Sequence, residues 1–123
     1  MRFEMSVLPD LLLEGAPPPS LPELAAAQRL RLDGEEIRAI EHALQSIEAP
    51  AYLFGSRAET ARRGGDIDLL VLTDAPGFET SRRVATRFFA RCEEKIDVIV
   101  LDPARLSPAQ RAFLEGIHAV RIR

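Results

Sequence analysis

The sequence predicts an α+β fold, a small mixed β-sheet with helices packed on it, and three observations support this prediction. Helical and strand-like segments follow one another in the order helix, strand, loop, strand, helix, strand, helix. The segment DIDLLVL at 66–72 is apolar on both faces after its first residues, as expected of a central strand covered on both sides. A helical segment then precedes the next strand, so these two strands are expected to lie parallel with a right-handed connection.

Length and composition restrict the class of protein. The chain has 123 residues, 46% of them hydrophobic, and a formal net charge of -3. One domain is therefore expected, and the charge makes a nucleic-acid partner unlikely. No apolar run approaches the roughly 20 residues of a membrane span, and the first residues do not resemble a signal peptide. With Cys92 as the single cysteine, we expect a cytoplasmic protein that does not act at a membrane.

The chain is expected to divide into an N-terminal extension, residues 1–32, and a domain, residues 33–123. The extension contains the proline run APPPS, which excludes a helix interior or a central strand there. A short helix at about 21–30 is expected after it. Ser20 and Glu23 have the spacing of a capping box at its start.

The first helix of the domain has clear start and stop signals. Asp33 and Glu36 form a second candidate capping box, and Pro50 ends the helical pattern. Between them, apolar residues recur at helical spacing and define one apolar stripe: Ile37, Ile40, Leu44 and Ile47.

The remaining elements follow from periodicity and from caps. We expect strands at 51–54, 66–72 and 95–101, helices at 79–92 and 108–115, and a final edge strand in AVRIR at 119–123. The helix at 79–92 has Val84, Phe88 and Cys92 on one apolar stripe. Asp102-Pro103 and Ser107-Pro108 each have the pattern of a cap followed by proline at the first helical position.

Three aspartates are expected to converge at one end of the sheet. Asp66 and Asp68 share a face because the period of a strand is two residues. Asp97 occupies the corresponding place at the start of the next parallel strand. Three carboxylates at close range must either hold protons through raised pKa values or bind cations. Mg²⁺ prefers carboxylate oxygens and also accepts phosphate ligands, and two ions about 3.5 to 4 Å apart can serve an in-line displacement.

Each aspartate also has a simpler interpretation. Asp66 can cap a turn after Gly64-Gly65, and Asp97 can be a strand-entry residue paired with a basic side chain. The shared face of all three, together with the Gly-Ser turn upstream, favours a functional cluster. The pattern does not fit an EF-hand loop, and the chain has no Walker P-loop motif.

A Gly55-Ser56 pair follows the strand at 51–54. Glycine permits close approach of a ligand to the backbone, and Ser56 can open a short helical turn whose free amides attract phosphate. Glu59 lies at capping-box distance from Ser56, and three arginines add positive charge: Arg57, Arg62 and Arg63. An ordinary capped turn with solvated arginines is the alternative interpretation.

LFGSRAETARRGGDIDLLVL at 53–72, with KIDVIV at 95–100, resembles the minimal nucleotidyltransferases of the DNA polymerase β-like superfamily. The signature of that superfamily is Gly-Ser, about ten residues, Asp-x-Asp, and a third aspartate on a later strand. Here nine residues separate Ser56 from Asp66. Thr60 stands where many relatives have glycine. The resemblance covers about residues 33–122 and implies a core like the polymerase β palm.

The resemblance implies transfer of a nucleoside monophosphate, with AMP from ATP expected, to an acceptor hydroxyl. It implies that Asp66 and Asp68 hold two Mg²⁺ ions, and that Asp97 completes one metal site and helps to deprotonate the acceptor. Gly55 and Ser56 would bind the β- and γ-phosphates. Arg57 is a further candidate for phosphate contact.

The resemblance also bears on partners. Minimal members are often paired with a helical HEPN-type protein, and some are antitoxins that attach AMP to that partner. We therefore expect a HEPN-type partner or a homodimer. The alternatives are a non-catalytic partner-binding subunit and a stand-alone transferase for a small molecule.

Overall fold

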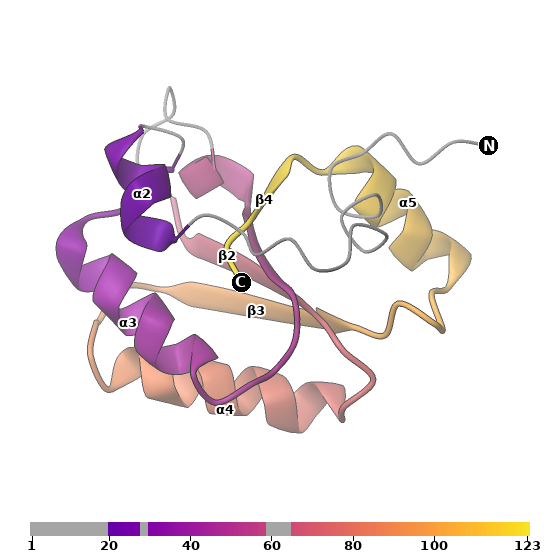
Figure 1. The fold of residues 1–123 in the computed structure, drawn as a ribbon. Coiled ribbons are helices and arrows are strands. Elements are labelled where there is room, and N and C mark those ends of the chain that lie inside the picture. The colour runs from indigo at the N-terminus through magenta and orange to yellow at the C-terminus, as the bar shows by residue number, and fades with distance from the viewer. Residues whose placement is uncertain (1–19, 28–29, 59–64) are drawn as a thin grey trace.

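A four-stranded mixed sheet lies at the centre of the protein (Figure 1). The computed structural model describes residues 20–27, 30–58 and 65–123. The strands lie in the order β3-β2-β1-β4, with β2 antiparallel to β1 and parallel to β3, and β4 antiparallel to β1 at the far edge. Their bounds are Ala51–Phe54 for β1, Ile67–Leu72 for β2, Ile96–Leu101 for β3 and Ala119–Arg121 for β4. The α+β class, the parallel pair and the edge strand are confirmed.

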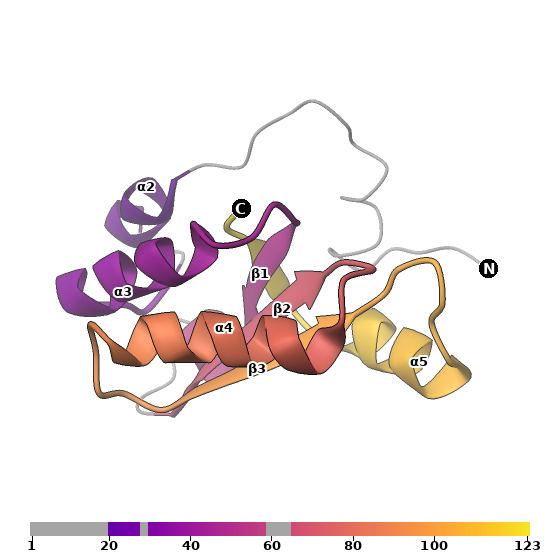
Figure 2. The ribbon, with the colours of Figure 1, turned by 90° about the horizontal axis from the view of Figure 1, so that it is seen from below.

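Helices cover both faces of this sheet, but unequally. Their bounds are Leu21–Ala26 for α2, Gly34–Leu44 for α3, Gly77–Phe89 for α4 and Pro108–Gly116 for α5. Figure 2 shows α3 and α4 side by side, with α5 apart from them. The alternation of β2 separates two cores: Leu69 and Val71 pack with α3 and α4, whereas Leu70 and Leu72 pack with the α5 residue Leu114.

The starts of α2, α3 and α5 follow caps that the sequence predicts. Capping boxes are present at Ser20 with Glu23, and at Asp33 with Glu36. A third begins α5, where the side chain of Ser107 accepts a hydrogen bond from the Gln110 amide. Each box satisfies amides that the first helical turn leaves without a partner.

One expected helix start is wrong. Asp102-Pro103 opens a turn, in which the Asp102 carboxylate accepts a hydrogen bond from the Ala104 amide at 2.9 Å and the Asp102 carbonyl accepts one from the Arg105 amide at 3.0 Å. These bonds use the backbone amides of Ala104 and Arg105, so Asp102 stabilises a local turn in place of a helix start. The chain then starts its helix at the second cap, Ser107.

Part of the predicted N-terminal extension packs on the domain. Helix α2 is shorter than the expected 21–30, and its Leu21 and Leu24 are buried in the same core as α3 and α4, as is Leu30. Residues 1–19 lie outside the described part of the chain, and the boundary at residues 32 and 33 stays a prediction. Within the described residues, no helix has the length and apolarity needed to cross a membrane.

The core between the sheet and helices α3 and α4 can be tested by substitutions in α4. Phe88 is fully buried, whereas Phe78 on the same helix is 72% exposed. We expect Phe88→Ala to lower the free energy of unfolding by about 3 to 5 kcal/mol, because it opens a cavity. Phe78→Ala is the control and should cost less than about 1 kcal/mol, the most that its contact with Arg82 contributes. Urea denaturation measures both, and equal losses would contradict this description of α4.

Candidate functional site

The register of β2 with its neighbours places the predicted residues in one row. Asp68 pairs with Asp97 across the parallel β2–β3 ladder and with Phe54 across the antiparallel β1–β2 ladder. Gly55 follows Phe54 directly and begins the 3-10 turn η1, Gly55–Ala58. The carboxylates of β2 and β3 and the Gly-Ser turn after β1 therefore lie at the same end of the sheet.

The aspartates lie on the face that α5 covers only in part. Ile67, on the opposite face of β2, is fully buried in the core that α3 and α4 cover. Asp68 points to the other face and is half-buried, whereas Asp66 and Asp97 are exposed. Within the described residues, the packing on the α5 face involves the later residues of β2 and β3, and Asp66 and Asp97 are exposed at this end of the sheet.

Asp68 lies close to two other carboxylates, those of Asp97 and Asp66. Burial raises the pKa of its carboxyl above the ordinary value, and the neighbouring carboxylates of Asp97 and Asp66 raise this pKa further. Like charges at close range and partial loss of water both disfavour the ionised form. A bound cation would relieve both costs, and this is the electrostatic reason to regard the cluster as a binding site.

Gly55 is in direct contact with that carboxyl group. Its φ is +74°, a left-handed conformation that residues with a side chain rarely adopt. A Cβ atom at this position would collide with the Oδ2 atom of Asp68. The sequence places glycine here for two reasons: the turn needs a positive φ, and the backbone must lie against Asp68.

A second close approach ties the turn to the Asp-x-Asp segment. Gly65, with a φ of +88°, lies so near Ser56 that a Cβ atom would collide with the serine Oγ. Gly65 immediately precedes Asp66, so Ser56 and the start of the carboxylate segment are in van der Waals range. The expected contributions of Glu59, Arg62 and Arg63 lie outside the described residues.

Arg57 has partners that sequence reasoning missed. Its Nη1 donates to both carboxylate oxygens of Glu36 at 2.9 Å and to the Arg31 carbonyl at 3.1 Å, and its Nε donates to the Gly65 carbonyl at 3.1 Å. The two charged side chains are almost fully buried, with 8% of Arg57 and 4% of Glu36 exposed. The sequence contained one signal of this ion pair. Glu36 lies one helical turn before the apolar Ile40, and a carboxylate on the buried side of a helix needs a cationic partner.

The donor set fits a hard divalent cation by its chemistry, since all three side chains are carboxylates. Within the described part of the chain, however, no three side chains of the His, Cys, Asp or Glu types are gathered closely enough to hold a metal ion. The arrangement gathers carboxylates beside the η1 turn, and Asp66 and Asp97 are exposed to solvent.

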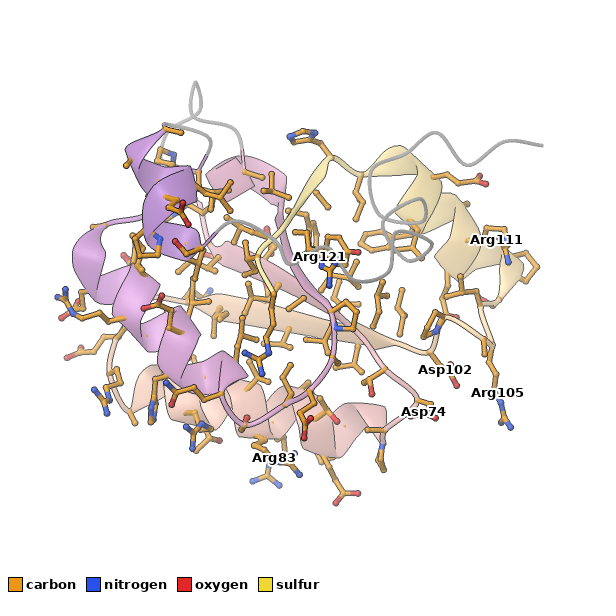
Figure 3. The ribbon with its side chains drawn as sticks, in the orientation of Figure 1. Asp74, Arg83, Asp102, Arg105, Arg111 and Arg121 are labelled. Carbon is orange, nitrogen blue, oxygen red and sulfur yellow. The ribbon has the colours of Figure 1, made fainter. Side chains whose placement is uncertain are left out.

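The opposite ends of β2 and β3 also have aspartates. Figure 3 shows Asp74 and Asp102 beyond the carboxyl ends of the two strands, on the α5 side of the molecule. No Gly-Ser turn accompanies them, and Asp102 accepts the turn hydrogen bond described above. These two residues are natural controls for charge removal at the candidate site.

Comparison with known proteins points to the same part of the chain. A family model described as "Polymerase beta, Nucleotidyltransferase" matches residues 35–120, which include all three aspartates and the Gly-Ser turn. A search of curated protein sequences found no match to this chain.

The raised pKa of Asp68 predicts how stability depends on pH. The folded state holds this proton more tightly than the unfolded chain does. Its stabilising contribution is therefore complete below the unfolded pKa and is lost as the pH rises through the raised folded pKa. With a chelator present, we expect Asp68→Asn to be more stable than the wild type at pH 7, and this difference to shrink near pH ~4.

Urea denaturation at both pH values measures the difference, with Asp74→Asn as the control at the other end of β2. A variant Asp68→Asn that is less stable than the wild type at pH 7 would contradict the charge repulsion at this site.

Proposed function

Because the chain belongs to the polymerase β nucleotidyltransferase family through residues 35–120, we propose that it transfers a nucleoside monophosphate, with AMP from ATP expected, to an acceptor hydroxyl. The observation that supports this most is the contact of Gly55 with the Asp68 carboxyl, opposite Asp97. It brings the turn after β1 next to the group of carboxylates.

We assign metal binding to the three aspartates. Asp66, Asp68 and Asp97 would hold two Mg²⁺ ions, which when bound neutralise phosphate charge and activate the acceptor oxygen. The closeness of Asp97 and Asp66 to Asp68, which raises the pKa of Asp68, supports this assignment, because a bound cation would offset the repulsion between the carboxylates. Asp97, exposed at the start of β3, is assigned the further role of accepting the acceptor's proton.

Phosphate binding is assigned to Gly55 and Ser56. Backbone amides of the 3-10 turn that begins at Gly55 would bind phosphate oxygens without a cationic side chain. Catalysis would then consist mainly of positioning and charge neutralisation, as in other phosphoryl transfers.

The acceptor is proposed to be a protein. A HEPN-type helical partner would make the chain the antitoxin of a toxin–antitoxin pair, while a homodimer would supply the acceptor site from a second copy. The site at the open end of a small sheet supports this choice, since enclosed pockets for small ligands tend to form between domains. The alternatives are a non-catalytic partner-binding subunit and a stand-alone small-molecule transferase.

The metal assignment has a direct test. We expect the double variant Asp66→Asn with Asp68→Asn to lose Mg²⁺-dependent ATP binding while it remains folded, because removing like charges relieves repulsion. Calorimetry with Mg²⁺ and ATP measures binding, and thermal unfolding checks the fold. The matched control is Asp74→Asn with Asp102→Asn, which removes the same charge at the other end of the strands. Binding by the first double variant at wild-type strength would refute the metal site.

The acceptor has a separate test. We expect a co-purifying partner from the native host to gain the mass of one or more AMP units after incubation with ATP and Mg²⁺, and to gain none with Asp97→Asn. Intact mass spectrometry of the complex measures the gain. A stable partner without mass gain would support the binding subunit, and a lone monomer that adenylylates a metabolite would rule out the protein acceptor.

A further inference from the structure

We propose that Arg57 and Glu36 are positioning residues, which lock the phosphate-binding turn η1 to the carboxylate segment and to the start of α3. This inference rests on the proposed function for its catalytic meaning. It assigns Arg57 a role different from the phosphate contact that sequence alone suggests. The two residues are called the clamp below.

The clamp begins with a charge pair enclosed by protein. Both Glu36 oxygens accept hydrogen bonds from the same Arg57 nitrogen, Nη1, at 2.9 Å. Glu36 Oε1 also accepts the capping bond from the Asp33 amide at 2.8 Å, so the carboxylate is fixed by the helix start itself. The position of the guanidinium is therefore set by the first turn of α3.

The guanidinium also connects the η1 turn to the residue before Asp66. The Nε–H of Arg57 donates to the carbonyl of Gly65, eight residues later, at 3.1 Å. This bond holds Gly65 where it contacts the Ser56 side chain. Since Asp66 is the next residue, the clamp determines the separation of the Gly-Ser turn from the first carboxylate.

The backbone on the other side of Arg57 is also held. The Arg57 carbonyl accepts a hydrogen bond from the Arg31 amide at 2.8 Å, and Nη1 donates back to the Arg31 carbonyl at 3.1 Å. The turn is thus joined to the segment that precedes α3 in both directions. Among the described residues, Arg57 contacts one more charged group, the largely exposed Glu94, at 4.0 Å from Nη2.

These contacts argue against a direct phosphate contact by Arg57. To use Nη1 or Nε on a phosphate, the arginine would have to leave a buried carboxylate without a cation, which is costly. Phosphate binding by backbone amides of η1 would require no such exchange. A fixed Arg57 instead orients these amides and Asp66, and misplacement of catalytic groups by about 1 Å can reduce rates roughly 100-fold.

Two conservative variants separate the positioning role of Arg57 from a direct contact of Arg57 with phosphate. Glu36→Gln removes the charge but keeps an oxygen that can accept the capping bond. Arg57→Lys keeps the positive charge but loses the forked geometry and the Nε–H. Glu35→Gln, an exposed carboxylate in the same first turn of α3, is the matched control. All variants are compared in the full chain after thermal unfolding has shown that they fold.

The measurements are amide hydrogen exchange by NMR and calorimetric binding of ATP with Mg²⁺. For both clamp variants we expect faster exchange at the Arg31 amide and in residues 55–58 and 65–68, by about tenfold, because charged hydrogen bonds are lost. We also expect about tenfold weaker ATP binding in both, and no change in either measurement for Glu35→Gln.

Glu36→Gln is decisive. A carboxylate cannot bind phosphate, so if Arg57 acts on phosphate directly, freeing it from Glu36 should leave ATP binding unchanged or strengthen it. That result, or unchanged exchange in both clamp variants, would overturn the proposal. If the wild type itself binds no ATP, the proposed nucleotide function fails, while the exchange data still decide whether the clamp locks the turn.

Discussion

The register of β2 between its two neighbours is the constraint on which the candidate site depends. It puts Phe54, Asp68 and Asp97 in a single row across three strands. A slip of one residue would turn Asp68 into the core beneath α4 and expose Leu69 in its place. The burial of the apolar face therefore enforces the position of the carboxylates, and sheet stability and site geometry have the same origin.

The same row concentrates like charges, which the fold tolerates because only one of them is partly withdrawn from water. Asp68 is half-buried and has a raised pKa, whereas Asp66 and Asp97 remain exposed. Like charges this close together cost stability, and a cation bound there would offset that cost.

The buried pair of Arg57 and Glu36 illustrates a different balance. Removing two charges from water is expensive, and such pairs often add little net stability compared with apolar residues. This pair is nevertheless satisfied by further bonds to Asp33, Arg31 and Gly65. Its main consequence is geometric, since it joins segments that approach one another only in the folded chain.

The sequence alone determined much of this protein. Hydrophobic periodicity located the strands and helices, and the capping pairs at Ser20 and Asp33 marked the helix starts, because both signals act over a few residues. The period of two placed Asp66 and Asp68 on one face, and the helix between β2 and β3 implied the parallel pairing that brings Asp97 beside them. Local signals misled at Asp102-Pro103, where a side-chain turn stands in place of the expected helix cap.

Only the tertiary structure decided the partners of the Gly-Ser turn. Glu36 and Arg57 are 21 residues apart, and no local pattern specifies which cation a buried carboxylate will find. The contacts of Gly55 with Asp68 and of Gly65 with Ser56 likewise depend on the approach of separate segments. Interactions between residues close in sequence set the conformation of each segment. The packing of whole helices and strands sets the distances between segments, and the geometry of the candidate site depends on those distances.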